Sequence, residues 1–302
     1  MSAAAELPEG ETGFDQTLAV TLAARDARGR VVRLGPVLDT VLGAHAYPPA
    51  IRHLLAEALV LAALIGSLLK DDQGQLTMQA QTEAGIVDLL VCDYRGGELR
   101  GYVRHDAARL AQLGPNPSLF ALFGKGYLAI TFDLATSGRR YQGIVPLEGA
   151  SLAEACERYF AQSEQVPTLI RVAVSSEGGH CIAGGLLVQH LPEGEEGRER
   201  LHARLDHPAW EHVAALAGSI RHAELVDLAL SLEALVWRLF HEEDEVRVER
   251  RALLIRGCRC DAAHYEGVIS RFPPDEREAM RNDAGVIVVD CAFCSREFEI
   301  TL

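Results

Sequence analysis

The sequence predicts an α+β fold in three parts: a large N-terminal domain of mostly antiparallel strands and helices, a helical linker arm, and a small C-terminal domain. Strand-like and helix-like segments alternate from about residue 14 to residue 190, and the loops between the strands are too short for crossover helices. A change of composition at residues 191–200 and a concentration of cysteines after residue 257 set the rest of the chain apart. The expected domains are residues 1–190, 191–250 and 251–302.

Local patterns predict the elements of the first domain. Residues 48–69 predict a core helix that begins at Pro48 and Pro49; its most apolar run has 16 residues and includes Glu57. That run is shorter than the about 20 apolar residues of a membrane span. Residues 151–162 predict a second helix, in which Ser151 and Glu154 form a capping-box pattern. Strands are expected at residues 17–35 (two strands around a turn at residues 26–29), 75–82, 85–104 (with a turn at Gly96-Gly97), 126–134, 168–176 and 181–189.

Two amphipathic helices are expected in the linker arm, at residues 208–220 and 223–243. In the second, leucines recur every three or four residues and form one apolar face. These leucines are Leu225, Leu228, Leu232, Leu235 and Leu239. The pattern predicts a helical hairpin that packs this face on its neighbours and turns its charges to solvent.

The charge and the N-terminus narrow the class of protein. The net charge is −14, which argues against a general nucleic-acid-binding surface, because such affinity depends on Lys and Arg neutralising phosphates. The first 15 residues have no basic segment followed by an apolar one, so we expect no signal peptide and a cytoplasmic location. Thiols are kept reduced there, and clustered cysteines then indicate metal or redox chemistry.

Four of the seven cysteines form a Cys-x-Cys pair, Cys258 and Cys260, and a Cys-x-x-Cys pair, Cys291 and Cys294. Two close pairs joined by one loop suit a tetrahedral Zn²⁺ held by four thiolates. In an extended Cys-x-Cys segment both side chains point the same way and can reach one metal. An iron–sulfur cluster or a preformed pair of disulfides are the alternatives. The remaining cysteines, Cys92, Cys156 and Cys181, are expected to be inert core residues.

Four thiolates fill the coordination sphere and leave no open position, so hydrolytic chemistry is not expected. Each pair is close enough to form a local disulfide once the metal leaves, so the site can respond to oxidants; a purely structural site remains an equal alternative on the pairing alone. Structural zinc supplies on the order of 10–16 kcal/mol in small domains. Losing it should unfold the tail, stop the tail from supporting the arm, and expose the leucine faces, as a holdase requires.

Further segments throughout the chain resemble the heat shock protein 33 family of redox-regulated bacterial chaperones. They are "LKDDQGQLTMQAQTEAG" (69–85), "ELRGYVR" (98–104), "GKGYLAITFD" (124–133), "YQGIVPLEGASLAEACERYFAQSEQVPT" (141–168), "AGGLLVQHLP" (183–192) and "LFHEEDEVRV" (239–248). The terminal Cys-x-Cys and Cys-x-x-Cys motifs complete the resemblance. After Cys260 the chain departs from the family's usual run and reads "DAAHY", where His264 is expected to be a surface residue, with a spare metal ligand as the alternative.

The resemblance implies a binding protein rather than an enzyme. It implies one Zn²⁺ on Cys258, Cys260, Cys291 and Cys294 in a reduced, inactive form. Oxidation would form the disulfides Cys258–Cys260 and Cys291–Cys294, release zinc, loosen the arm, and give a typically dimeric form that holds unfolding client proteins without ATP. No G-x-x-x-x-G-K-[ST] motif occurs.

Two other functions compete with this interpretation. A zinc-ribbon regulatory or nucleic-acid-binding protein would use a purely structural metal, and the charge of −14 weighs against it. A thiol-disulfide oxidoreductase needs one exposed thiol of low pKa, which four thiolates committed to a metal do not provide. Nucleic acid and membrane are therefore not expected partners.

Overall fold

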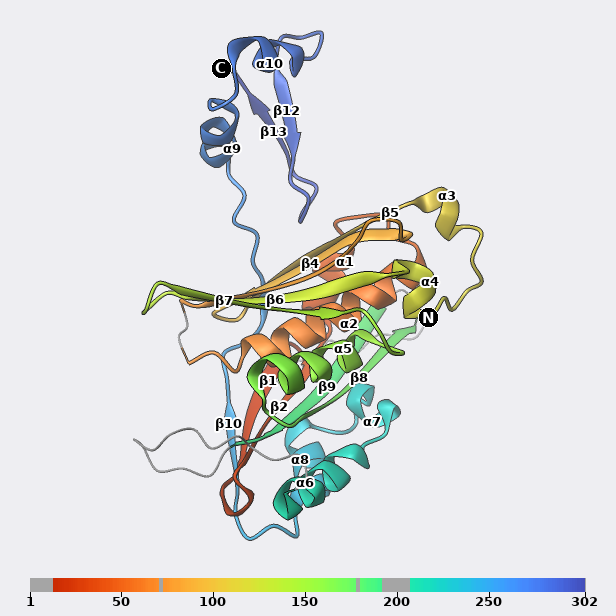
Figure 1. Cartoon of the computed structure of the whole chain (residues 1–302), viewed down its shortest axis with the longest axis vertical. Coiled ribbons are helices and arrows are strands. Elements are labelled where there is room, and N and C mark those ends of the chain that lie inside the picture. The colour runs from red at the N-terminus through yellow and green to blue at the C-terminus, as the bar shows by residue number, and fades with distance from the viewer. Residues whose placement is uncertain (1–12, 71–72, 178–179, 192–206, 302) are drawn as a thin grey trace, which may run out of the picture.

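The computed structural model describes residues 13–70, 73–177, 180–191 and 207–301. The body of the molecule consists of two sheets with a helical layer between them (Figure 1). The five-stranded sheet has the order β10-β1-β2-β9-β8, with bounds β10 (Val246–Arg250), β1 (Gln16–Leu22), β2 (Ala27–Leu34), β9 (His180–His190) and β8 (Thr168–Glu177). The six-stranded sheet has the order β11-β5-β4-β3-β6-β7, with bounds β11 (Ile255–Arg256), β5 (Glu98–His105), β4 (Val87–Arg95), β3 (Gln75–Thr82), β6 (Gly126–Leu134) and β7 (Arg139–Pro146).

Only the short β11 pairs with its neighbour in parallel among the strands described. The predicted α+β class with mostly antiparallel strands is therefore confirmed. The helices of the body are α1 (Pro36–Leu42), α2 (Pro49–Gly66), α3 (Ala107–Leu110), α4 (Leu119–Phe123) and α5 (Leu152–Tyr159). The remaining elements are α6 (Pro208–Gly218), α7 (His222–Val226), α8 (Leu232–Phe240), α9 (Ala262–Ile269), α10 (Pro274–Ala279), the short helical turns η1 (Ala23–Arg25) and η2 (Phe160–Glu164), and the hairpin of β12 (Ile287–Asp290) and β13 (Glu297–Ile300).

Helix α2 is the centre of the body and packs against strands of both sheets. It begins at Pro49, as the sequence predicts, because proline suits the first helical turn. Its length and hydropathy would also allow a membrane span, but 72% of it is buried inside the protein. This helix is therefore the core of the fold.

Local turn and cap signals were reliable guides. Gly96 and Gly97 both adopt positive φ angles, of 53° and 90°, and connect β4 to β5 as predicted. The Ser151 hydroxyl accepts the Glu154 N–H at 3.3 Å and caps α5. The Glu154 carboxylate instead accepts the N–H of Ala150 at 3.0 Å, so the capping box is shifted by one residue.

The arm, defined here as α6, α7 and α8, covers the outer face of the five-stranded sheet (Figure 1). The prediction of a single helix over residues 223–243 was wrong, because the structure has two helices there, α7 and α8. Asp227 leaves the helical conformation and its carboxylate accepts the N–H of Ala229 at 2.9 Å, while Ser231 caps α8 through the N–H of Ala234 at 3.1 Å. Leu228 lies in this break and is 51% exposed, whereas the other four leucines of the predicted face are buried. The composition change predicted at residues 191–200 lies almost entirely outside the described residues.

The arm and the sheet share one hydrophobic cluster. Its buried residues are Leu18, Val20, Leu22, Ala27, Val31, Ala173, Leu186 and Val188 from the sheet with Trp210, Val213, Ala217, Ile220, Leu225, Leu232, Leu235, Val236, Leu239 and Phe240 from the arm or its connections. Burial of one such large side chain contributes about 1.5–3 kcal/mol, so this interface is a major stabilising contact of the arm.

A buried arginine and a glycine hold α7 on the sheet. Arg33 in β2 is 1% exposed, and its guanidinium donates to the carbonyl oxygens of Leu225 at 3.0 Å and Leu230 at 2.8 Å, and to that of Glu224 at 3.3 Å. Gly184 in β9 pairs with Arg33 in the sheet, and α7 passes directly over it. Arg33 therefore satisfies two carbonyls at the end of α7 and one in the connection between α7 and α8.

Replacing Gly184 by alanine is expected to weaken the docking of the arm by about 1–3 kcal/mol, because the added Cβ would collide with the Leu225 carbonyl. Amide hydrogen exchange across α6–α8, together with the melting temperature, measures the effect. Gly114→Ala is the matched control, since no atom lies within 4 Å of a Cβ built there. Equal protection of the arm in both variants would show that the close approach at Gly184 is not needed.

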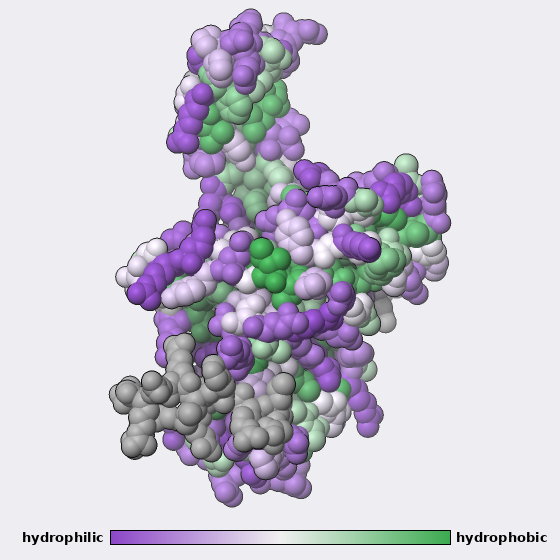
Figure 2. All heavy atoms as spheres, viewed as in Figure 1, coloured by the Kyte–Doolittle hydropathy of each residue, from purple (hydrophilic) through white to green (hydrophobic). Residues whose placement is uncertain are grey.

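After β10 the chain crosses the body and leads into the C-terminal module, defined here as residues 255–301. Leu254 is buried in the main core, and its N–H donates to the carbonyl of Asp15 at 2.7 Å. The module has a core of its own with only three buried apolar side chains, Ile269, Ile287 and Ile300. Figure 2 shows the module projecting from the body, with its hydrophobic side chains gathered in the half nearer the body. The division into three domains at residues 190 and 250 stays a prediction.

Candidate metal centre

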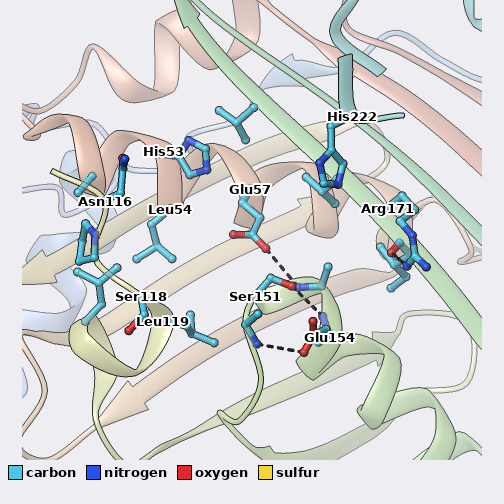
Figure 3. A pocket seen from close by; sticks show the side chains of 18 of the residues that line it. His53, Leu54, Glu57, Asn116, Ser118, Leu119, Ser151, Glu154, Arg171 and His222 are labelled. Atoms are coloured by element: carbon cyan, nitrogen blue, oxygen red, sulfur yellow. Dashed lines mark hydrogen bonds between the residues drawn. The ribbon is translucent and has the colours of Figure 1, made fainter. Parts of the chain in front are cut away.

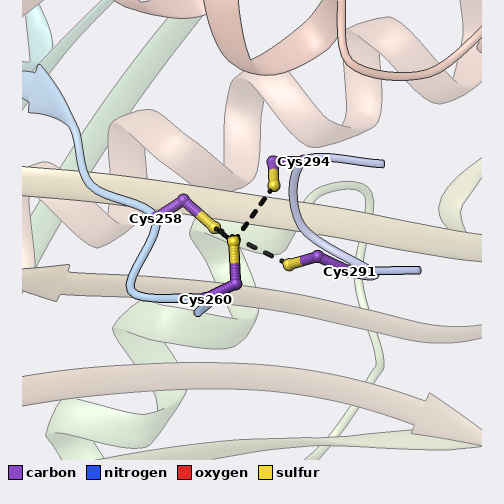
Figure 4. A group of neighbouring side chains, drawn as sticks. All are labelled: Cys258, Cys260, Cys291 and Cys294. Carbon is purple, nitrogen blue, oxygen red and sulfur yellow. Dashed lines mark hydrogen bonds between the residues drawn. The ribbon is translucent and has the colours of Figure 1, made fainter. Parts of the chain in front are cut away.

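The four predicted cysteines come together at the base of the C-terminal module (Figure 4). Their Sγ atoms all lie within 4.8 Å of one another, with 3.3 Å between Cys258 and Cys260, 3.6 Å between Cys258 and Cys291, and 3.4 Å between Cys260 and Cys294. In the part of the chain that the structure describes, this is the one group of three or more His, Cys, Asp or Glu side chains close enough to share a metal ion.

These distances fit four thiolates around a single ion. A tetrahedral Zn–S₄ site with bonds of about 2.3 Å places its sulfurs about 3.8 Å apart, close to the separations found here. None of the seven cysteines, all of which lie in the described ranges, is joined in a disulfide. His264 is exposed and does not belong to the cluster, so the candidate spare ligand is not brought to the site.

Two short backbone segments position the thiols. Cys258 and Cys260 directly follow β11, whose parallel pairing with β5 continues through a hydrogen bond from the Gly257 N–H to the Leu99 carbonyl at 2.9 Å. Cys291 and Cys294 lie in the tight turn between β12 and β13. In that turn the N–H groups of Cys294 and Ser295 donate to the Cys291 carbonyl at 3.2 and 2.8 Å, and Ser295 has a φ of 54°.

The surroundings of Cys291 favour its thiolate. Burial alone would raise the pKa of the Cys291 thiol, but hydrogen bonds from the Tyr265 hydroxyl and from the backbone amides of Phe293 and Cys294 outweigh burial and lower this pKa to about 6. Burial and the neighbouring thiols raise the pKa of Cys260. Groups that donate to a sulfur stabilise its negative charge, and a metal-binding thiolate needs such donors.

The other three cysteines lie buried in the body, as expected of core residues. Cys92 and Cys156 are fully buried, and burial raises the pKa of both thiols. Cys181 is 1% exposed, and burial raises its pKa as well. A thiol that stays protonated and shielded reacts slowly with oxidants.

The residues that lie between the cysteines of each pair attach the cluster to the six-stranded sheet through polar and aromatic contacts. Arg259, inside the Cys-x-Cys pair, donates to Gln75 Oε1 at 2.7 Å and lies 3.4 Å from a carboxylate oxygen of Glu98. Phe293, inside the Cys-x-x-Cys pair, packs on Arg100 and Tyr102 of β5. The thiol cluster therefore stands where the C-terminal module meets the body.

Sequence reasoning missed a cleft of about 1450 Å³ beside α2 and α5 (Figure 3). The sequence feature that could have indicated this cleft is Glu57, the one charged residue in the apolar run of α2. The Glu57 carboxylate accepts the N–H of Ala153 at 3.3 Å at the start of α5, and burial raises its pKa. Glu157 and Arg171, on another wall, pair at 3.2 Å. These groups satisfy one another or the backbone, so their contacts account for them structurally.

The chain is similar to known proteins along most of its length. The model of the Hsp33 protein family matches residues 15–301. The chain is 41% identical over 281 residues to a 33 kDa chaperonin of Caulobacter vibrioides, covering 90% of each chain, and 37% identical over 276 residues to one of Ectopseudomonas mendocina, covering 90% of this chain and 88% of the relative.

A solved structure shares the fold. The crystal structure of a 33 kDa chaperonin, a heat shock protein 33 homolog from Thermotoga maritima, superposes with a TM-score of 0.78 at 23% identity. The superposition covers 95% of this chain and 94% of the other. Since the family model and the relatives both span nearly the whole length, the chain belongs to the Hsp33 family.

Proposed function

We propose that this protein is a redox-regulated, ATP-independent holdase chaperone whose four-cysteine zinc site keeps it inactive while reduced. Its similarity to proteins named 33 kDa chaperonin supports a chaperone that binds unfolding client proteins. The observation that carries the regulatory part is the position of the thiol cluster: it joins two segments of a module with very little core of its own. It acts by binding rather than by catalysis.

The module depends on its metal for stability. Its hydrophobic cluster has three buried isoleucines with Tyr265, Val289 and Phe298 only partly buried around them, so few apolar contacts stabilise it. When bound, Zn²⁺ would supply about 10–16 kcal/mol by cross-linking the four thiolates. Cys258, Cys260, Cys291 and Cys294 are the proposed ligands, held in place by β11 and by the turn before β13.

Oxidation removes these ligands. With peroxide as the oxidant, the Cys258 and Cys260 thiolates would form one S–S bond and those of Cys291 and Cys294 a second. The four thiolates give up four electrons in all; two peroxide molecules take them up with four protons and leave as four waters, while the divalent metal is released. Neither disulfide contains a sulfur of the other pair, so the link across the module is lost.

Loss of the module then weakens the arm. The segment between β10 and β11 fastens the module to the body through hydrogen bonds of Arg251 to the Thr17 carbonyl at 2.9 Å and of Leu254 to the Asp15 carbonyl. We propose that disorder spreads from this segment through β10 into α8. The apolar side chains under the arm, on β1, β2 and β9, would then be free to bind exposed apolar segments of clients.

The resemblance to the family supports the rest of the proposal: a homodimer in the oxidised state, a cytoplasmic location, and no part for nucleic acid or membrane in the activity.

The test follows zinc release with a chromogenic chelator while peroxide is added at a mildly unfolding temperature. Light scattering of a chemically unfolded client is recorded in parallel. We expect about one equivalent of zinc to be released as client aggregation is suppressed, and both changes to reverse on adding thiol reductant and zinc. Zinc retained, or lost without protection of the client, would mean that the metal is only structural.

A further inference from the structure

We propose that the outer face of the six-stranded sheet carries a socket for aromatic side chains of client proteins, and that Phe293 fills this socket while the chain is reduced. The socket is defined by His45, Arg100 and Tyr102. The inference rests on the proposed function and adds to it a binding surface distinct from the one under the arm.

Phe293 is held on two sides by residues of β5. The guanidinium carbon of Arg100 lies 4.1 Å from the centre of the Phe293 ring, and the Tyr102 ring meets it edge-on, with 4.9 Å between ring centres at 83°. These are the favourable geometries of cation–π and aromatic pairs. Such contacts select an aromatic ring over an aliphatic side chain.

The body, and not the module, organises the socket. Arg100 pairs with Asp93 at 2.6 Å, and Asp93, buried on β4, also accepts the Thr77 hydroxyl at 2.8 Å. Tyr102 lies within β5 and keeps its place through the strand pairing with β4. The socket therefore keeps its shape when the C-terminal module leaves.

His45 adds recognition of the backbone beside the ring. Its Nε2 lies 3.0 Å from the Ala292 carbonyl and its Nδ1 lies 3.0 Å from the Ser295 hydroxyl. Because a carbonyl can only accept, Nε2 donates to Ala292, and Nδ1 of the neutral ring accepts from Ser295. The His45 ring rests on Tyr47, with 4.9 Å between ring centres. The socket therefore binds an aromatic ring through Arg100 and Tyr102 and the neighbouring backbone carbonyl through His45. Together these contacts would recognise a peptide segment that contains an aromatic residue.

The socket opens onto further apolar surface. The strand registers align Tyr102 with Val91, and across Gln79 with Ala129 and Ile144, all on the outer face. Ile144 is 58% exposed, and Val91 is half-buried. An extended segment with an aromatic residue in the socket could therefore continue past Val91 and the polar Gln79 toward Ile144 on β7. Segments of this kind are buried in native proteins and exposed in unfolding ones.

Oxidation would remove Phe293, the plug of the socket, from its place. Ala292 and Phe293 lie between Cys291 and Cys294, so a disulfide between these two cysteines would close a ring around them and change the turn that presents Phe293. The rest of the module would lose its order at the same time. In the reduced chain, Phe293 therefore occupies the site that an aromatic side chain of the client would occupy after oxidation.

The experiment places a photoreactive phenylalanine analogue, p-benzoylphenylalanine, at position 91 of the full-length chain, because Val91 pairs with Tyr102 in the sheet and lies beside the socket without being part of it. The matched control carries the analogue at position 120, because Phe120 on α4 is 66% exposed and lies outside the socket. Each protein is irradiated with chemically unfolded citrate synthase, before and after oxidation. We expect the oxidised chain to cross-link the client at position 91 about tenfold more than at position 120, and the reduced chain to cross-link its own C-terminal module there.

Phe293→Ala in the position-91 protein empties the socket without touching the thiols. It should retain one equivalent of zinc when reduced and nevertheless cross-link the client without oxidation. Equal cross-linking at positions 91 and 120, in an oxidised chain that still suppresses aggregation, would overturn the socket and leave the proposed function standing. No rise for the Phe293→Ala protein would overturn the role of the plug, and an oxidised chain that does not suppress aggregation would end both proposals.

Discussion

Replacing Cys258 and Cys260 together by serine is expected to abolish tight metal binding and to unfold the C-terminal module while the body stays folded. Two of the four sulfurs are removed, and the remaining two, Cys291 and Cys294, come from a single turn. The module then loses most of the about 10–16 kcal/mol that structural zinc provides. Its three buried isoleucines cannot replace that free energy.

Metal analysis by mass spectrometry and amide exchange across residues 255–301 measure this outcome. We expect less than one-tenth of an equivalent of zinc after dialysis, loss of protection in α9 and β12, and unchanged protection in α2. Cys181→Ser is the matched control, because it makes the same chemical change at a buried site outside the cluster. One equivalent of zinc bound with unchanged affinity in the double variant would show that the ligands lie elsewhere.

Arg33→Met is expected to weaken the docking of the arm on the body and leave the zinc site intact. Methionine keeps most of the side-chain volume but cannot donate to the carbonyls of Glu224, Leu225 and Leu230. Leaving these carbonyls without their donor costs about 2–4 kcal/mol of local stability, which is large for three short helices. The apolar cluster under the arm would then be exposed in a larger fraction of molecules.

Fluorescence of a dye that binds apolar surface, and amide exchange in α7 and α8, test this variant under reducing conditions with zinc present. Arg33→Lys is the control, because it keeps the charge and the N–H donors of a single nitrogen but loses the forked geometry, and it should give an intermediate effect. If Arg33→Met leaves the exchange of α7 unchanged, the buried arginine does not anchor the arm. Zinc content should equal that of the unmodified chain in both variants.

The parts of the fold that local chemistry decides could be predicted from the sequence. Gly96-Gly97 permits positive φ angles and so predicts the β4–β5 turn, and Ser151 predicts the start of α5 through its cap. The cysteine spacing predicts which four sulfurs meet, because two close pairs restrict the possible arrangements strongly. The leucine spacing predicts which side of α8 is buried.

The rest depends on contacts between residues far apart in the chain. The break between α7 and α8 goes against the leucine pattern, since Asp227 and Ser231 offer hydrogen bonds that compete with a continuous helix. Arg33 on β2 reads as an ordinary surface residue until the carbonyls of α7 are known to lie above it. Likewise, His45 and Ser295 are 250 residues apart, and no sequence pattern links them.

The pairing of β10 affects how the arm returns to its docking site on the body after it has come loose. The strand pairs with β1 through five residue pairs, while β9, before the arm, is held between β2 and β8. Once β10 has paired with β1 again, the chain between β9 and β10 is a loop tied at both ends. Closing a tied loop costs little more entropy as it lengthens, and its ends meet at an effective concentration on the order of millimolar. An arm tied in this way stays within its own contour length of its docking site, so it competes with a bound client for as long as the client stays.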